Sequence, residues 1–405
     1  MSRVTAAVFA MPERGHFKRM LPLIAGLVRA GVTTHVFTAA GFREDVARAG
    51  GQFIDLFASH TVEHADATSI PVPCRFVTFA GLFGDEIAKV AGALRPSLVV
   101  HDTFAVVGQV VANRLGVPRV NVCACHNLAP VPTLEALSRD PRVRIADACW
   151  AAVHTLRERH GIPDASPFSY VSAVSRDLNL YCEPPQFLRP DERAPFQPIA
   201  FFGSLWPEGE RRESPSGSMF GRDPARPLRV YASFGTIIWR YYQEAALTTL
   251  EALSSALHDR KDAEALISLG GAGPLATAAK MASRNVRIEH YVDQWQVLGD
   301  ASIYLTHQGL NSTHEAIYHG VPMLSYPFFS DQPGLSARCQ DLGLAVPVVD
   351  ALRGAVTAND IHAALDRIAA SRTQMVGCLA AAREWELETI RARPEVVDRV
   401  IGLVR

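Results

Sequence analysis

A cluster of polar residues stands out between residues 306 and 332, in the segment THQGLNSTHEAIYHGVPMLSYPFFSDQ. It begins at the end of an apolar run, SIYLTH, which is typical of a buried strand. In open α/β sheets, ligands collect at the carboxyl ends of the strands. We therefore interpret this segment as part of a ligand site, with the candidate residues His307, Gly309, Asn311, Ser312, Glu315, Asp331 and Gln332.

The same segment predicts the start of a helix. Ser312 and Glu315 have the spacing of a capping box, so one interpretation gives them no role beyond capping. A helix that starts after Gly309 also offers N–H groups and the positive end of its dipole to an anion. A second small-residue turn, ASFGT, places Gly235 and Thr236 after another predicted strand. Together the two turns favour a diphosphate that is held by backbone amides and His307, with little need for lysine.

Alternating strands and helices must position these residues. The first half has apolar runs that predict strands at 4–10, 32–40, 51–57, 96–102 and 117–125, with helical patterns between them. Such alternation implies a parallel sheet with right-handed crossovers. Residues 127–198 are less regular and rich in proline and aromatics, so we expect helices and loops there.

A polar segment with no hydrophobic periodicity, 206–227, then separates two similar halves. The strand-helix pattern restarts at residue 228 and ends in a helical tail with an expected break at Pro394. We predict an α/β protein of two Rossmann-like domains that face each other across a cleft. The expected parts are an N-terminal domain 1–205, a linker 206–227, a C-terminal domain 228–380 and a tail 381–405 that packs back on the N-terminal domain.

Length and charge limit the class of protein. A chain of 405 residues is long for one core, and 48% hydrophobic residues can fill two. The formal net charge of -1 argues against a protein that binds nucleic acid through a strong positive field. The N-terminal apolar run resembles a buried strand rather than a signal peptide, and no 18-residue apolar stretch predicts a membrane span.

The seven cysteines show no disulfide framework, which suits reduced thiols in the cytoplasm. Cys123, Cys125 and His126 are the nearest approach to a metal motif, but no second Cys or His pair follows at a finger-like spacing. We interpret them as residues at a strand end, and we expect no metal and no cofactor.

The polar segment resembles a known signature. HQGLNSTHEAIYHGVPMLSYPFFSDQ is similar to the nucleotide-sugar motif of inverting glycosyltransferases with the GT-B fold. The family that it resembles contains plant secondary-product, vertebrate UDP-glucuronosyl and bacterial antibiotic glycosyltransferases. Its pattern is H-x-G-x-N-S, a Glu eight residues after the His, and a D/E-Q pair sixteen residues further on. This sequence has matching residues at those spacings, and the order of its parts agrees with the family over the whole chain.

The resemblance implies a role for each matching residue. His307, Gly309, Asn311 and Ser312 would hold the diphosphate, with Gly235 and Thr236 on its other side. Glu315 would bind the ribose hydroxyls, and Asp331 and Gln332 would bind the hydroxyls of the sugar; Asp331 could instead only cap its helix.

The base-binding turn departs from the family pattern. The family usually has W-x-P-Q, whereas this chain has Tyr291, Val292, Asp293 and Gln294. Tyr291 can still stack on a pyrimidine, and the Val292 backbone can still pair with its edge. Asp293 in place of proline leaves the contacts to the base undecided, so uracil and thymine both stay open. We expect a UDP-sugar as the donor, with a dTDP-sugar as the alternative. Tyr291 could also be an ordinary half-buried strand aromatic.

His16 follows the first predicted strand, in a loop, where the similar enzymes keep their general base. A histidine near neutral pKa can take the proton of an attacking hydroxyl. It works better when a carboxylate holds its other nitrogen, and Asp102 ends a strand where the family also has an Asp. His101 should point to the opposite face, because side chains alternate along a strand.

The resemblance therefore implies a metal-independent transfer of a hexose, first of all glucose, to a hydroxyl of a lipophilic small molecule with inversion. The acceptor would lie in the N-terminal half among apolar residues that could equally be ordinary core: Phe79, Phe83, Leu128, Phe168 and Tyr170. Three alternatives stay open: a dTDP-deoxysugar transferase of antibiotic biosynthesis, a sugar-nucleotide epimerase, and a non-catalytic partner of another glycosyltransferase.

Overall fold

The computed structural model describes residues 4–205, 219–221, 225–258 and 260–404. The chain forms two compact units, Met1–Trp206 with Glu388–Arg405, and Pro207–Leu387. Most of the predicted linker, 206–218 and 222–224, lies outside the described residues. The second expected boundary, between residues 380 and 381, lies inside a continuous helix, and the units divide after residue 387.

Seven parallel strands form the sheet of the first unit, in the order β3-β2-β1-β4-β5-β6-β7. β1 and β4 lie at its centre. Their residues are almost all buried, because a central strand is covered on both faces. The strands are β1 (Thr5–Phe9), β2 (Thr33–Thr38), β3 (Gln52–Asp55), β4 (Leu98–Asp102), β5 (Arg119–Cys123), β6 (Leu178–Tyr181) and β7 (Ile199–Phe201).

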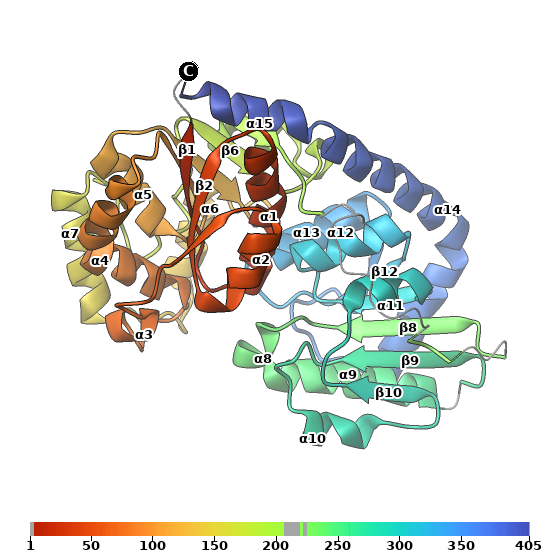
Figure 1. Cartoon of the computed structure of the whole chain (residues 1–405). Helices are drawn as coiled ribbons and strands as arrows, with labels where there is room; N and C mark the ends of the chain where they lie inside the picture. The colour runs from red at the N-terminus through yellow and green to blue at the C-terminus, as the bar shows by residue number, and fades with distance from the viewer. Residues whose placement is uncertain (1–3, 206–218, 222–224, 259, 405) are drawn as a thin grey trace. The chain divides into compact units, whose positions relative to one another are not determined.

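Helices cover both faces of this sheet (Figure 1). On one face α4 packs against both α5 and α7, and on the other lie α1, α2 and the last helix, α15. Their bounds are α1 (Arg14–Arg29), α2 (Arg43–Arg48), α3 (Val62–Ala65), α4 (Pro73–Ala93), α5 (Val106–Leu115), α6 (Pro130–Arg139), α7 (Asp147–Arg159) and α15 (Arg393–Gly402).

The segment 127–198 differs from the prediction of helices and loops alone. It contains α6 and α7, but also β6, which pairs with β5 in the sheet. The strand is four residues long, and one of its residues is the fully buried Asn179. A short run with a polar residue inside gives little hydrophobic signal, which explains why the sequence did not indicate it.

The end of the chain completes the first unit. The guanidinium of Arg393 is buried and donates hydrogen bonds to the carbonyls of Phe202 (2.8 Å) and Leu205 (2.6 Å). α15 also packs closely on α1, since a side chain at Gly26 would meet Val397. The first unit is therefore built from two separate stretches of sequence.

Six parallel strands form the sheet of the second unit, in the order β10-β9-β8-β11-β12-β13. β8 and β11 are central, and the apolar face of the sheet packs on α9 and on the first half of α14. The strands are β8 (Leu228–Ser233), β9 (Ala263–Ser268), β10 (Val286–Glu289), β11 (Ile303–Thr306), β12 (Met323–Ser325) and β13 (Ala345–Pro347).

The helices of the second unit follow the predicted alternation. α11 and α12 contact each other on the face opposite α9 (Figure 1). The bounds are α8 (Ile238–Tyr241), α9 (Gln243–His258), α10 (Leu275–Ala278), α11 (Gln294–Asp300), α12 (Leu310–His319), α13 (Gln332–Asp341) and α14 (Ala358–Arg391). α14 ends just before Pro394, at the predicted break, and its last residues belong to the first unit.

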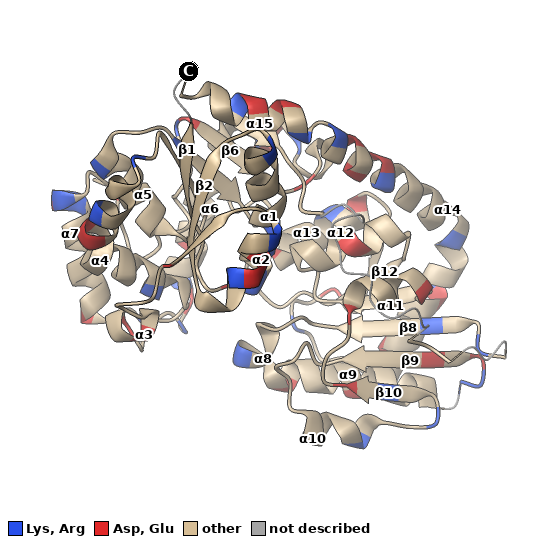
Figure 2. Cartoon of the chain, viewed as in Figure 1, with Lys and Arg blue, Asp and Glu red and all other residues tan. Residues whose placement is uncertain are grey.

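Charges of both signs are mixed over the helices, as on α14 and α15 (Figure 2). This mixture agrees with the formal net charge of -1. No helix within the described part of the chain is long and apolar enough to cross a membrane. The prediction of two parallel α/β domains is confirmed.

Candidate active site

The carboxyl end of the first sheet brings His16 and Asp102 together. Nδ1 of His16 lies 2.7 Å from Oδ1 of Asp102, which is fully buried, while the His16 side chain is 13% exposed. Asp102 is the last residue of β4, as expected. His16 is not in a loop, as we predicted, but in the first turn of α1, which begins at Arg14. Residues 10–13 join β1 to this helix, so the two central strands of the sheet position the pair.

The pairing fixes which nitrogen of His16 can act. An ionised carboxylate only accepts hydrogen bonds, so its contact with Nδ1 places the ring proton there. Nε2 then carries a lone pair and can accept a proton. The neighbouring histidine, His101, has no such role: it is fully buried, its Nδ1 bonds to the Asp102 carbonyl, and burial lowers its pKa to about 3.

Two further side chains surround the imidazole of His16. The ring of Phe104 stacks on it with 3.9 Å between the centroids. The sulfur of Cys125 lies 3.9 Å from Nε2. Phe104 follows β4 and Cys125 follows β5, so both come from the same edge of the sheet as Asp102. Nε2 therefore faces a largely apolar surrounding rather than open water.

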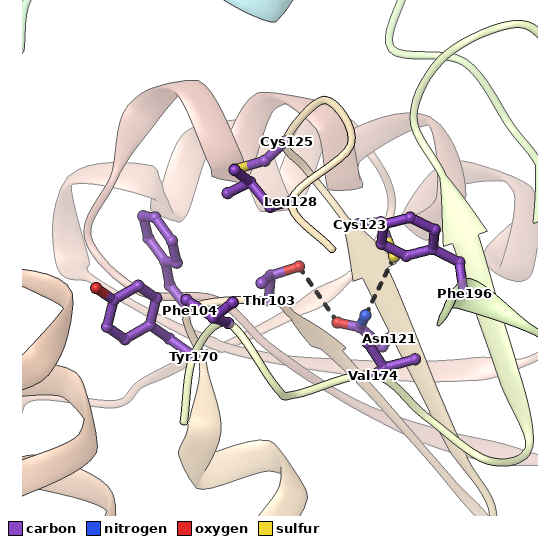
Figure 3. Close-up of a pocket in the computed structure, with 10 residues that line it drawn as sticks. Thr103, Phe104, Asn121, Cys123, Cys125, Leu128, Tyr170, Val174 and Phe196 are labelled. Carbon is purple, nitrogen blue, oxygen red and sulfur yellow. Dashed lines mark hydrogen bonds between the residues drawn. The ribbon is translucent and has the colours of Figure 1, made fainter. Parts of the chain in front are cut away.

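Phe104 and Cys125 also line a narrow pocket in this unit (Figure 3). Of the residues predicted to bind an acceptor, Leu128 and Tyr170 line it as well. Phe79 is fully buried in the core, Phe83 stacks on His60, and Phe168 is buried with its ring edge-on to Tyr170. The prediction missed several other residues that line the pocket: Thr103, Phe104, Asn121, Cys123 and Cys125. Thr103 and Phe104 could have been found, because they directly follow Asp102 at the end of its strand.

In the second unit, the predicted residues gather at the ends of β8 and β11. The His307 ring is packed so closely against Gly235 and Gly309 that a side chain at either glycine would meet it. At Gly235 an added Cβ would lie 3.1 Å from Cε1 of His307, and its φ of 69° also favours glycine. Thr236, next to it, is exposed. The two glycines are thus needed to hold the histidine ring at the carboxyl edge of the sheet.

The start of α12 corrects one prediction. Ser312 and Glu315 do not form a capping box, because the N-cap is Gly309 and Ser312 is already the third residue of the helix. Thr313 donates the first helical N–H bond, to the Gly309 carbonyl. The first amides of α12, including that of the half-buried Asn311, lie before this bond and next to His307. A helix N-terminus in this position is suited to bind an anion.

A hydrogen-bond network joins α11 to α12. Gln294 donates from Nε2 to Oε2 of Glu315 (2.8 Å) and to the Ser312 hydroxyl (3.3 Å). Its carbonyl accepts from the Tyr304 hydroxyl at 2.8 Å. Burial raises the pKa of Tyr304 well above its usual value, so this hydroxyl stays a donor. Gln294 therefore orients Glu315, and the other carboxylate oxygen of Glu315 is the one suited to a ligand.

The turn before α11 presents Tyr291 at the surface. Tyr291 is 61% exposed and follows β10, so it is not the half-buried strand aromatic of the alternative interpretation. Its ring lies against Gly271, at the end of β9. Val292 is buried, and Asp293 caps α11 by accepting from the Trp295 amide. Asp293 thus starts the helix at the position where the family pattern has proline.

The side chains of Asp331 and Gln332 lie in different surroundings. Asp331 is half-buried at the N-cap position of α13. Gln332 is 6% exposed, and its carbonyl accepts from the amides of Phe328 (2.9 Å) and Phe329 (3.3 Å). The Gln332 oxygen therefore shapes the loop before α13, while its amide nitrogen is the part suited to a ligand.

The described residues contain no group of three or more His, Cys, Asp and Glu side chains that could hold a metal ion. His126, beside the two cysteines of the possible metal motif, instead bonds to Glu183 at 2.8 Å, and both are buried. Burial raises the pKa of the Cys123 thiol far above its usual value, which keeps it protonated.

Comparison with known proteins connects these features to a family. Residues 229–374 match the family described as UDP-glucoronosyl and UDP-glucosyl transferase. This range contains Gly235, the α12 segment and the Asp331-Gln332 pair. NDP-glycosyltransferase YjiC of Bacillus subtilis is 24% identical over 352 residues, which cover 85% of each chain. Oleandomycin glycosyltransferase of Streptomyces antibioticus is also 24% identical, over 98% of this chain and 96% of that protein.

Solved structures agree on the fold. The glycotransferase of kitacinnamycin aligns with a TM-score of 0.76 at 21% sequence identity, covering 99% of this chain and all of that chain. The two parallel α/β sheets described above therefore form the GT-B fold.

Proposed function

From the premise that this chain is a glycosyltransferase of the UDP-glycosyltransferase family, we propose that it transfers a hexose from a UDP-sugar to a hydroxyl of a lipophilic small molecule. The observation that carries this proposal is the 2.7 Å contact between His16 and the buried Asp102. A histidine whose Nδ1 is held by a carboxylate, and whose Nε2 faces a pocket, is equipped to deprotonate a bound hydroxyl. We propose that the reaction runs in the cytoplasm.

The reaction is a single displacement at the anomeric carbon. The acceptor oxygen forms a bond to this carbon while the bond to the diphosphate oxygen breaks, and the electron pair of that bond leaves with the diphosphate. The hydroxyl proton moves to Nε2 of His16, and the resulting imidazolium is stabilised by Asp102. Attack from the face opposite the leaving group inverts the anomeric configuration.

The leaving diphosphate is bound at the start of α12. His307 and the amides of the first turn provide hydrogen-bond donors and the positive end of the helix dipole. The close packing of His307 on Gly235 and Gly309 supports this role, because it fixes the ring beside those amides. Three further residues border the same edge of the sheet or the first turn of the helix: Thr236, Asn311 and Ser312. With this set of donors no metal is required.

The nucleoside and the sugar occupy the neighbouring strand ends. Tyr291 stacks on the base through its exposed ring, and the Val292 backbone pairs with the base edge. Glu315 accepts from the ribose hydroxyls, with Gln294 holding it in place. Asp331 and the amide nitrogen of Gln332 accept from and donate to neighbouring hydroxyls of a gluco-configured hexose.

A dTDP-deoxysugar is the alternative donor, and one observation favours it. The Gln332 side-chain carbonyl already accepts hydrogen bonds from two backbone amides. Asp331 and Gln332 can therefore form fewer hydrogen bonds to sugar hydroxyls than they could if this carbonyl had no such partners. A site with less hydroxyl recognition tolerates a sugar that lacks hydroxyls. Asp331 decides between the two donors, because its carboxylate can accept a hydrogen bond from a sugar hydroxyl of glucose but not from a dideoxy sugar that lacks this hydroxyl.

The test compares UDP-glucose, UDP-N-acetylglucosamine and a dTDP-dideoxy sugar as donors for a phenolic acceptor. We expect a product heavier by one hexose with UDP-glucose, and a strong loss of glucose transfer in Asp331→Ala. Preference for the dideoxy sugar would favour the alternative donor, and unchanged glucose transfer in Asp331→Ala would refute the proposed role of Asp331. Asp341→Ala, at the other end of α13, serves as the matched control and should transfer glucose normally.

The same assay separates the other classes of function. A sugar-nucleotide epimerase would change the donor without any acceptor, and it would need carboxylates near the anomeric carbon rather than a His-Asp pair. A non-catalytic partner would form no product at all, and we would expect it to have lost the donor residues or His16, which this chain retains. Product formation that requires both substrates excludes both classes.

A further inference from the structure

The pocket beside His16 has a polar patch in its wall. Most of its lining is apolar, from Phe104 and Tyr170 at one end to Phe196 at the other. Between these ends, Thr103 and Asn121 form a bonded pair (Figure 3). The space between the walls admits a group of about the size of one water molecule, so a single small substituent fits and a ring does not.

The amide of Asn121 has a fixed orientation. Asn179 uses its amide nitrogen as a donor to two backbone carbonyls, of Ser175 (2.6 Å) and Pro198 (3.4 Å), and its oxygen accepts from the Ser175 amide at 2.7 Å. That oxygen also accepts from the Asn121 amide nitrogen at 3.2 Å. Asn121 must therefore present its nitrogen to Asn179, and its carbonyl oxygen to the opposite side.

This carbonyl oxygen is under-used as an acceptor. Among the described residues its partner is the Thr103 hydroxyl, at the long distance of 3.4 Å, and this hydroxyl donates better to the Val122 carbonyl, at 2.9 Å. Asn121 is 1% exposed, so bulk water does not compensate. A buried carbonyl oxygen with two lone pairs and one weak bond can take a further donor.

The surroundings of Asn121 are neutral. The Cys123 thiol accepts from its amide nitrogen at 3.2 Å, and burial raises the pKa of this thiol so that it carries no charge. None of the described residues that line the pocket is cationic, so nothing among them would attract an anionic group. The group that fits is thus neutral, small and able to donate a hydrogen bond.

We propose that Asn121 is a specificity determinant for the acceptor, and that it recognises a second hydroxyl or amino group beside the hydroxyl that reacts. The inference rests on the proposed function, because Phe104 and Cys125 join this pocket to Nε2 of His16. An acceptor with hydrogen at that position leaves the Asn121 oxygen unsatisfied. A methyl ether at the same position is too large and offers no donor, so it is rejected more strongly.

The test uses small phenols as probes and UDP-glucose, or whichever nucleotide sugar is active, as donor. Catechol, resorcinol and hydroquinone present the second hydroxyl at three spacings, and phenol and the three methoxyphenols are their analogues. We expect kcat/KM for at least one dihydroxy probe to exceed that for phenol roughly tenfold, after correction for its two reactive hydroxyls. The corresponding methoxyphenol should be slower than phenol. Equal rates for phenol and all three dihydroxy probes would overturn the inference.

Two variants assign the preference to Asn121. Asn121→Leu should bring the ratio between the preferred probe and phenol close to one, whereas Thr103→Val, which changes the neighbouring polar side chain, should keep the ratio. A ratio that survives in Asn121→Leu would overturn the assignment. Thermal melting verifies that each variant folds. If Asn121→Leu does not fold, the comparison of the phenol probes with the wild-type protein still tests the proposal. Failure of the wild type to glycosylate any acceptor would instead refute the proposed function.

Discussion

Replacement of His16 by alanine removes the proposed general base and leaves the rest of the first unit in place. General bases contribute roughly 10²- to 10⁴-fold to a rate, which corresponds to about 3–5 kcal/mol of transition-state stabilisation. The structure favours a full contribution here, because Asp102 holds Nδ1 at 2.7 Å and the ring is stacked on Phe104. We expect His16→Ala to lower kcat by this factor for an aliphatic alcohol, with UDP binding unchanged.

The assay varies the acidity of the acceptor. A strongly acidic phenol such as nitrophenol ionises without help, so its rate should depend little on His16, whereas an alcohol should show the full loss. Asp102→Asn should cost less than His16→Ala, because Asp102 orients the ring and does not transfer the proton. His154→Ala, which removes an exposed histidine of α7, is the matched control.

Two results would refute this reasoning. One is near-complete activity of His16→Ala with the aliphatic alcohol. The other is an equal loss for all acceptors regardless of their acidity, which would indicate a positioning role for the ring rather than proton transfer.

Four further predictions follow from single features of the fold. Gly309→Ala should displace the His307 ring, lower the free energy of unfolding by about 1–3 kcal/mol and weaken UDP binding, measured by urea denaturation and calorimetry; unchanged UDP affinity would contradict the packing argument. Burial opposes the charge of Asp66, but hydrogen bonds from Ser69, Thr68 and Thr78 outweigh it and hold the pKa of Asp66 below its usual value. Its carboxylate should therefore stabilise the fold above about pH 4, and this contribution should vanish as the pH falls through the lowered pKa, so that wild type and Asp66→Asn converge in acid; a constant difference would argue against it. Ellman's reagent should label Cys378 first in the native protein and all seven cysteines after unfolding, since the other six are buried; rapid labelling of several thiols in the native state would be the contrary result. Transfer should continue in excess EDTA, and a loss that Mg²⁺ or Mn²⁺ restores would show that the amides of α12 are not sufficient.

The sequence predicted the order of most strands and helices, because most of the buried strands contain a run of apolar residues. It also predicted that Asp102 and His307 lie at the ends of strands, and the structure has Asp102 as the last residue of β4 and His307 directly after β11. β6 could not be predicted in this way, since it is four residues long and includes the buried Asn179. The hydrogen bonds that allow Asn179 to be buried involve partners that are distant in sequence, such as Asn121.

Local spacing misled the prediction in one place. Ser312 and Glu315 have the spacing of a capping box, but α12 begins earlier, at Leu310, because Gly309 ends the tight turn around His307. Glu315 instead bonds to Gln294, 21 residues before it in the sequence. Such contacts arise only when α11 and α12 pack together, so no pattern within either helix could indicate them.

The buried Arg393 has a consequence for how this protein can be recombined. Its bonds to Phe202 and Leu205 tie the last helix to the residues after β7, so the first unit needs both ends of the chain. The second unit is, in topological terms, an insertion between them. A chimera with a relative that is cut once, near residue 206, would combine an arginine and carbonyls from different parents. Exchange of the second unit between relatives therefore calls for two crossovers, near residues 206 and 388, so that Arg393 and its partners Phe202 and Leu205 are inherited together.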